Sequence, residues 1–260
     1  MAKTMKKKSV FGEVHPSIIA VWAALIAASH FLPGIPLFGI GGTMSVSAVL
    51  LPLTGIFFGP FAGGLCGGIG QFIGYLIEPS AAWAGMFTWL LDVITPVISG
   101  CLAFGFGKGT KGKVRPFVAL GLTALAFLGW FTHPIGQAAP IYAFVFGGYG
   151  LACVVLGIFF AKRFLLSKNV ILKAIAVFVC SAGGMIIMSV LSGVVNFYVF
   201  ATPADVWKML ATLAPIERSM FSAAAMLIGV PLLMGLPKIG VPAGPMAEGE
   251  ADDDEDEEVV

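Results

Sequence analysis

The chain has 260 residues, of which 58% are hydrophobic and 11% are charged, and its formal net charge is +1. A soluble globular protein with a polar surface is excluded, because a chain of this length cannot bury so many apolar residues. The net charge says little about partners, and we expect no nucleic acid among them. Nine of the 14 acidic residues are concentrated between Glu248 and Glu258.

Eight long apolar runs follow one another along the chain. They lack the period-two alternation of barrel strands, and each is near the ~20 residues with which a helix spans a bilayer. The sequence therefore predicts an all-α polytopic membrane protein with about eight transmembrane helices. In chain order the runs cover about 18–32, 44–58, 61–77, 84–106, 117–131, 141–160, 170–200 and 220–236.

Two of these runs have further features. Only Gly59 and Pro60 separate the second run from the third, which predicts a tight turn there. The seventh run is too long for one perpendicular helix. We expect tilt, a break near Gly183 and Gly184, or an extension at its outer end.

The basic residues predict the orientation of the chain. Thirteen of the 15 Lys and Arg residues lie before the first run or after the fourth, sixth and last runs, and only Lys208 and Arg218 fall on the opposite side. Positively charged loops stay in the cytoplasm. We therefore expect a cell-membrane protein with both termini cytoplasmic, a single transmembrane domain over 1–240, and a disordered acidic tail over 241–260.

With this orientation, polar and aromatic residues gather at the outer ends of several helices. We expect them to line one pocket for a small molecule, although Trp and Tyr also serve as anchors at membrane interfaces. The candidate substrate-binding residues are Gln71, Tyr75, Trp89, Asp92, Asn196, Tyr198, Glu217 and Arg218.

Asp92 is the carboxylate that lies well inside an apolar run. Ionisation there without a partner is expensive, so an acid at such a position is a functional candidate by default. The alternative is a structural role, in which Asp92 caps a broken helix or pairs with Arg218.

Small residues mark two helices as contact surfaces. Ala20, Ala24 and Ala28 recur every four residues on the first helix, a spacing that lets another helix approach closely, either within the protein or from a partner. The third run is rich in glycine, which indicates a tightly packed helix. The four cysteines all lie inside apolar runs and suggest neither a disulfide framework nor a zinc site.

These motifs resemble those of the substrate-binding S components of energy-coupling factor (ECF) vitamin transporters. The stretch from Leu53 to Gln71 is similar to their Gly-Pro hairpin and glycine-rich third helix, and the segment from Ala214 to Arg218 resembles the start of their last helix. The alanine stripe matches the pattern with which the family docks on its transmembrane coupling subunit. The chain departs from the family in having Gln71 where an acidic residue is common, and in an apparent extra hairpin at about 116–163.

The resemblance implies high-affinity binding and uptake of a vitamin or related heterocycle in the outer half, beneath the loop from Pro33 to Thr43. ATP would be hydrolysed by two cytoplasmic ATPase subunits that act through the coupling subunit. The chain itself would then carry no catalytic residues, cofactor or metal. Ala20, Ala24 and Ala28 would form the docking face.

Two other classes of function stay open. A self-sufficient secondary transporter or channel would use Asp92 for proton or sodium coupling. A membrane assembly scaffold is the second alternative. An intramembrane hydrolase or ATPase has little support, because the chain contains no HExxH, Walker A or GxSxG motif and no metal-ligand spacing.

Overall fold

The computed structural model describes residues 14–36, 43–79, 84–107, 109–241 and 243–245 of the chain. The predicted all-α polytopic class is confirmed. The α-helices of this part are α1 Pro16–Ala28, α2 Ser47–Ile77, α3 Thr88–Asp92, α4 Ile94–Phe104, α5 Gly109–Trp130, α6 Pro134–Ala138, α7 Gly148–Leu156, α8 Lys162–Leu166, α9 Val170–Val199 and α10 Ala204–Gly235.

Short elements connect these helices. The 3₁₀ segments are η1 Ser29–Phe31, η3 Gly85–Phe87 and η6 Leu236–Ile239, and the π-helical segments are η4 Tyr142–Gly147 and η5 Gly157–Ala161. Between α1 and α2, the two-residue strands β1 Ile35–Pro36 and β2 Thr43–Met44 pair antiparallel. The basic N-terminal segment, most of the loop expected over the pocket, and the acidic tail lie outside the described residues.

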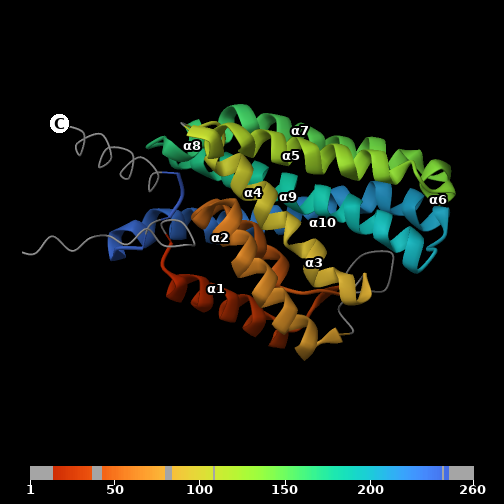
Figure 1. Cartoon of the computed structure of the whole chain (residues 1–260), viewed down its shortest axis with the longest axis horizontal. Coiled ribbons are helices and arrows are strands. Elements are labelled where there is room, and N and C mark those ends of the chain that lie inside the picture. The colour runs from red at the N-terminus through yellow and green to blue at the C-terminus, as the bar shows by residue number, and fades with distance from the viewer. Residues whose placement is uncertain (1–13, 37–42, 80–83, 108, 242, 246–260) are drawn as a thin grey trace, which may run out of the picture.

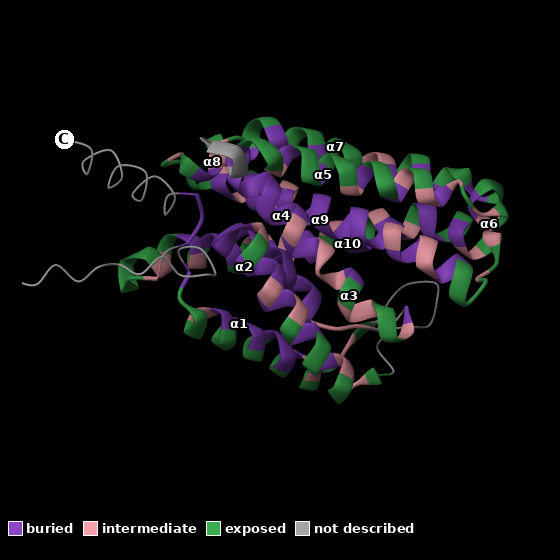
Figure 2. Cartoon of the chain, in the orientation of Figure 1, coloured by how far each residue is buried: buried purple, intermediate pink, exposed green. Residues whose placement is uncertain are grey.

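The helices form a bundle with α9 in its interior. Figure 1 shows α5 and α7 along one side of the bundle and α1 on the opposite side, with α4, α9 and α10 between them. Helix α9 packs against α2, α4, α5, α7 and α10. Buried residues concentrate between these layers, and the outer sides of α1, α5 and α7 carry many exposed residues (Figure 2). An apolar exterior of this kind suits a lipid environment.

Helix α2 reverses direction at Gly59, as the Gly-Pro pair predicts. Gly59 has φ +80° and ψ 173°, a conformation that a residue with a side chain rarely adopts. Beyond the turn the chain runs back along itself. Two hydrogen bonds join the halves: the Thr54 hydroxyl donates to the Gly63 carbonyl at 3.1 Å, and the Ser47 hydroxyl donates to Gln71 Oε1 at 3.4 Å. The two halves, 47–58 and 60–77, therefore form an antiparallel hairpin.

Six helices of the described chain are long and apolar enough to cross a membrane, and Pro16–Phe31 is a shorter apolar helix. One of the six, α2, is folded at Gly59 and so provides two apolar segments, and Pro16–Phe31 provides another. The apolar helical segments therefore agree with the prediction of about eight. The long seventh run is one continuous helix, α9, without a break at Gly183 or Gly184. The break is therefore wrong, while tilt and an outer extension stay predictions.

Glycines allow α2 to pack on α4 backbone to backbone. A Cβ at Gly55 would overlap the carbonyl oxygen of Pro96, and a Cβ at Gly100 would lie 2.6 Å from the Pro60 nitrogen. A Cβ at Gly63 would lie 2.6 Å from the Gly55 Cα in the other half of the hairpin. Close packing of this kind replaces the hydrophobic driving force that is missing between helices in lipid.

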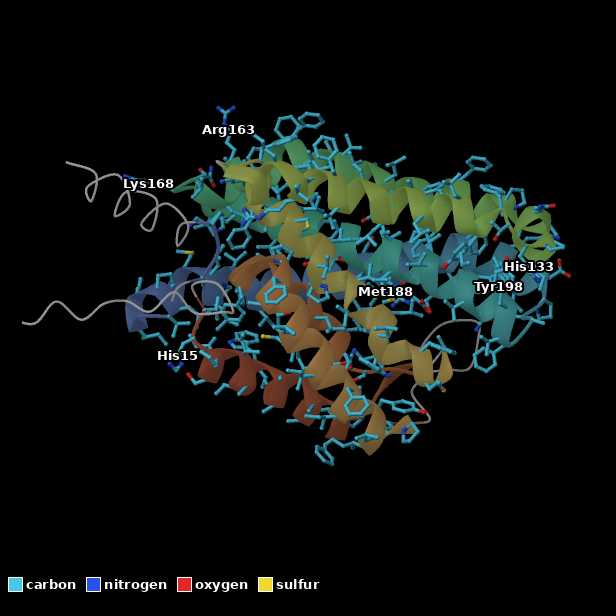
Figure 3. The ribbon with its side chains drawn as sticks, viewed as in Figure 1. His15, His133, Arg163, Lys168, Met188 and Tyr198 are labelled. Carbon is cyan, nitrogen blue, oxygen red and sulfur yellow. The ribbon has the colours of Figure 1, made fainter. Side chains whose placement is uncertain are left out.

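The two ends of the bundle differ in charge. Arg163 and Lys168 lie at the end where α8 is found, and His133 and Tyr198 lie at the opposite end (Figure 3). At the basic end, the Lys162 Nζ donates to the Phe106 carbonyl at 3.1 Å. The basic loops are thus gathered at one end, the pattern that the positive-inside rule associates with the cytoplasmic side.

Candidate small-molecule-binding site

A cavity lies between α2, α3, α9 and α10 in the half of the bundle away from Gly59. The volume open to the centre of a water molecule is about 140 Å³. One water needs about 10–15 Å³ by this measure, so the space equals roughly ten waters. A small organic molecule can therefore fit in this cavity. Six of the eight candidate residues line it: Gln71, Tyr75, Trp89, Asp92, Glu217 and Arg218.

Gln71 is the centre of a polar network on one side of the cavity. Its Oε1 is 2.6 Å from Nε2 of His30 and accepts from the Ser47 hydroxyl, and its Nε2 donates to Asp92 Oδ2 at 2.8 Å. The Gln71 side chain is buried. A neutral amide thus links three helical segments, and both ends of its side chain have partners.

Asp92 lies at a break between two helices. α3 ends at Asp92 and α4 begins at Ile94. Pro96 causes this break, because its ring has no N–H for the Asp92 carbonyl and would clash with that carbonyl in a regular helix. The break leaves Asp92 at the cavity, four residues before the proline. The sequence predicts Asp92 inside an apolar run, and Gly85–Phe104 is still one apolar helical span.

Arg218 brings a positive charge to the same cavity from α10. Its Nη1 is directed at the Met44 sulfur, and its Nε is buried without a hydrogen-bond partner among the described residues. Arg218 interacts electrostatically with Asp92 and Glu217. A buried guanidinium nitrogen without an acceptor is costly unless a bound group supplies one. The cavity therefore combines three carboxylates, from Glu78, Asp92 and Glu217, with one guanidinium and neutral polar groups.

Aromatic side chains form another wall. Tyr142 and Trp207 line the cavity, their ring centroids are 5.3 Å apart, and both pack against the buried Trp130. Trp89, on the α3 side, packs edge-on against Phe72 at 5.2 Å. Aromatic walls with few polar groups are typical of sites for small organic ligands.

Asn196 and Tyr198 do not line the cavity. Asn196 is buried near the end of α9, where its carbonyl accepts from the amides of Phe200 and Ala201 and its side chain accepts from the Thr202 hydroxyl. Tyr198 is 61% exposed. Figure 3 shows it beside His133, far from Met188, a cavity residue on the same helix. The extension of α9 carries both residues past the cavity.

Several cavity residues were not among the sequence candidates. His30 contacts Gln71, and no pattern in the sequence signals this contact. Further cavity residues of this kind are Met44, Ser47, Tyr142, Met188 and Trp207. Tyr142 and Trp207 belong to a group of outer-end aromatic residues whose members cannot be told apart without the fold.

The alanine stripe lies on the outer surface of α1. Ala20, Ala24 and Ala28 are all exposed. The other face of α1 is buried against the bundle through Trp22 and Ile26, among others. The stripe therefore does not pack against another helix within the described part of the protein. Figure 2 shows the exposed side of α1 turned away from the other helices.

Fold and cavity together define a multi-pass helical membrane protein with a polar and aromatic cavity between its helices. Residues 15–139 match the family described as "ECF-type riboflavin transporter, S component". The match covers just under half of the chain and confirms the resemblance drawn from the sequence. The matched segment includes α5, the first helix of the hairpin expected to be additional. No curated protein and no solved structure matches the chain.

Proposed function

We propose that this chain is the substrate-specific subunit of an ATP-driven ECF transporter and that it binds a vitamin or related heterocycle in the cavity. The observation that supports this most directly is the meeting of six predicted residues from three helical elements at one cavity. A structural role for these residues would not require a cavity between them.

The chemistry of the lining favours a planar ligand with polar edges. Trp89, Tyr142 and Trp207 offer aromatic faces or edges, while Asp92 and Arg218 offer an acceptor and a donor. The matched family is named for riboflavin, a ligand of this kind. We therefore take riboflavin as the first molecule to test, with thiamine as a cationic heterocycle for comparison.

The outer surface supports the proposed partnership. We place the basic end in the cytoplasm, where two ATPase subunits would lie, and the cavity toward the outside of the cell membrane. The exposed face with Ala20, Ala24 and Ala28 would pack against the transmembrane coupling subunit, because small residues let two helices approach closely. ATP hydrolysis then belongs to the partners.

Titration of the detergent-purified chain with riboflavin and with thiamine tests the binding function. Trp89 and Trp207 line the cavity, so occupancy should change tryptophan fluorescence saturably. Asp92→Asn removes a charge from the cavity and should weaken binding about tenfold or more, since hydrogen bonds to charged groups contribute about 1.5–3 kcal/mol.

Asp205→Asn is the matched control, because Asp205 is an exposed acid on α10 that pairs with Lys208 at 2.9 Å. We expect this variant to bind as the wild type does. A lack of saturable response to either compound would contradict the proposed function. Transport by the purified chain alone, abolished by Asp92→Asn, would instead favour an ion-coupled transporter.

A further inference from the structure

Tyr142 belongs to the second half of the hairpin that follows α4, outside the residues that match the S-component family. The match ends at residue 139, and Tyr142 opens the π-helical segment η4 three residues later. Its side chain is 3% exposed and lines the same cavity as Asp92 and Arg218. The hairpin therefore supplies part of the cavity wall.

Other aromatic rings hold Tyr142 in place. Its ring stacks on Trp130 with centroids 4.6 Å apart and an interplanar angle of 21°, and it meets Phe146 at 4.9 Å. Trp130 is itself fixed, because its Nε1 donates to the Gly136 carbonyl at 3.0 Å and its ring packs against Phe197 at 4.6 Å. A ring with these contacts has little freedom to leave the wall.

The local backbone also sets the direction of Tyr142. A π-helical turn inserts one residue into a helix and shifts the side chains on either side of it, and such turns are frequent at functional sites. η4 extends from Tyr142 to Gly147 and packs against α10, the helix that carries Trp207 and Arg218. The turn thus occurs where the hairpin meets the cavity.

The hydroxyl of Tyr142 is the second observation. It interacts electrostatically with Arg218 and Glu217. Buried polar groups nearly always have a partner. Arg218, which also lines the cavity, has a buried Nε without a partner among the described residues. A cavity-lining tyrosine beside an arginine with an unpaired nitrogen indicates where a polar edge of a bound molecule would lie.

We propose that Tyr142 is a ligand-positioning residue that helps to determine which heterocycle this chain accepts. This inference rests on the proposed function, since it requires that a small molecule binds in the cavity. The ring of Tyr142 limits the width of the site and its hydroxyl hydrogen-bonds to a polar edge of the ligand. The half of the chain outside the family match would thereby contribute to specificity.

The test compares two phenylalanine substitutions on one continuous helical segment. Tyr142→Phe removes the cavity hydroxyl and keeps the ring packing. Tyr149→Phe removes a hydroxyl that bonds to Ser219 at 3.0 Å and that does not line the cavity. Both variants and the wild type are titrated with riboflavin and with thiamine by tryptophan fluorescence, and their thermal midpoints are measured.

Tyr142→Phe should weaken binding about threefold to tenfold for at least one compound, which corresponds to the loss of one hydrogen bond. It should also change the ratio of the two affinities and leave the thermal midpoint unchanged. Tyr149→Phe should leave both affinities unchanged. A helix that only supports the fold would not alter the affinity ratio.

Three outcomes would overturn the inference. Wild-type affinities in Tyr142→Phe would refute the role of Tyr142 while leaving the proposed function intact. Equal losses in Tyr142→Phe and Tyr149→Phe would assign the effect to packing of the hairpin. If the wild type binds neither riboflavin nor thiamine, the proposed function fails first and this inference fails with it.

Discussion

The amide of Gln71 organises the polar side of the cavity, because it donates to Asp92 and accepts from Ser47 while contacting His30. In the family that the chain resembles, an acidic residue is common at this position. Here an acid would place a second carboxylate beside Asp92, and two like charges at this distance repel each other strongly in a low dielectric. Gln71 and Asp92 are therefore best understood as a matched pair.

Gln71→Glu tests this pairing. The new carboxylate cannot donate to Asp92, so we expect the free energy of unfolding to fall by about 1–3 kcal/mol, the cost of leaving a buried polar group without its partner. The double variant Gln71→Glu/Asp92→Asn restores a donor opposite an acceptor and should recover most of the loss. Thermal or denaturant unfolding in detergent measures both. Additive losses in the double variant would show that the two side chains are independent.

Residue types could be predicted better than residue positions. Polar and aromatic residues at the outer ends of helices identified Gln71 and Asp92, because such residues are rare in apolar runs. The sequence does not predict where along the bundle each residue lies relative to the cavity. Helix α9 continues past the cavity and carries Tyr198 to the end of the bundle. The contact of His30 with Gln71 depends on how α1 packs against α2, which one sequence does not specify.

At the scale of elements, glycine determines how closely α2 and α4 approach. A Cβ at Gly55 would overlap the Pro96 carbonyl oxygen, which belongs to the backbone and cannot rotate away. The same contact fixes α4 just after the break that presents Asp92. Packing of these two helices and the shape of the cavity are therefore linked.

Gly55→Ala should lower the free energy of unfolding by about 1–3 kcal/mol, because overpacking forces backbone shifts. Gly121→Ala on α5 is the control, since a Cβ there meets nothing within 4 Å. Alanine is also the better helix former, so this variant should be neutral or slightly stabilising. The thermal midpoints of the purified variants measure the difference. Equal midpoints for the two variants would contradict the packing argument.

The turn at a Gly-Pro pair was easier to predict than the role of a glycine inside a helix. Gly59 followed by Pro60 signals a turn, because both residues disfavour a continuing helix and Gly59 adopts positive φ. Gly183 and Gly184 suggested a break in the same way, yet α9 is continuous there. Their role is contact, since a Cβ at Gly184 would lie 2.6 Å from the Thr95 carbonyl oxygen. Whether a glycine forms a turn or allows a close helix contact depends on the neighbouring helix.

At the scale of the whole molecule, three features occupy different places. The basic loops are at one end, the cavity is in the opposite half, and the exposed alanine face is on α1 at the side. This separation suits a subunit that binds its ligand on one surface and its partners on others. It also predicts that partner docking and ligand binding can be lost independently.

The most direct test is native mass spectrometry of the chain purified in mild detergent from its own host. We predict that the wild type retains a small heterocyclic molecule together with a transmembrane subunit and ATPase subunits. Ala24→Trp should retain the small molecule and lose the subunits, because a bulky ring prevents close helix contact. Leu128→Trp, at a 72% exposed position on α5, should keep both. A wild-type chain that carries neither ligand nor subunits, or an Ala24→Trp variant that loses both together, would contradict this prediction.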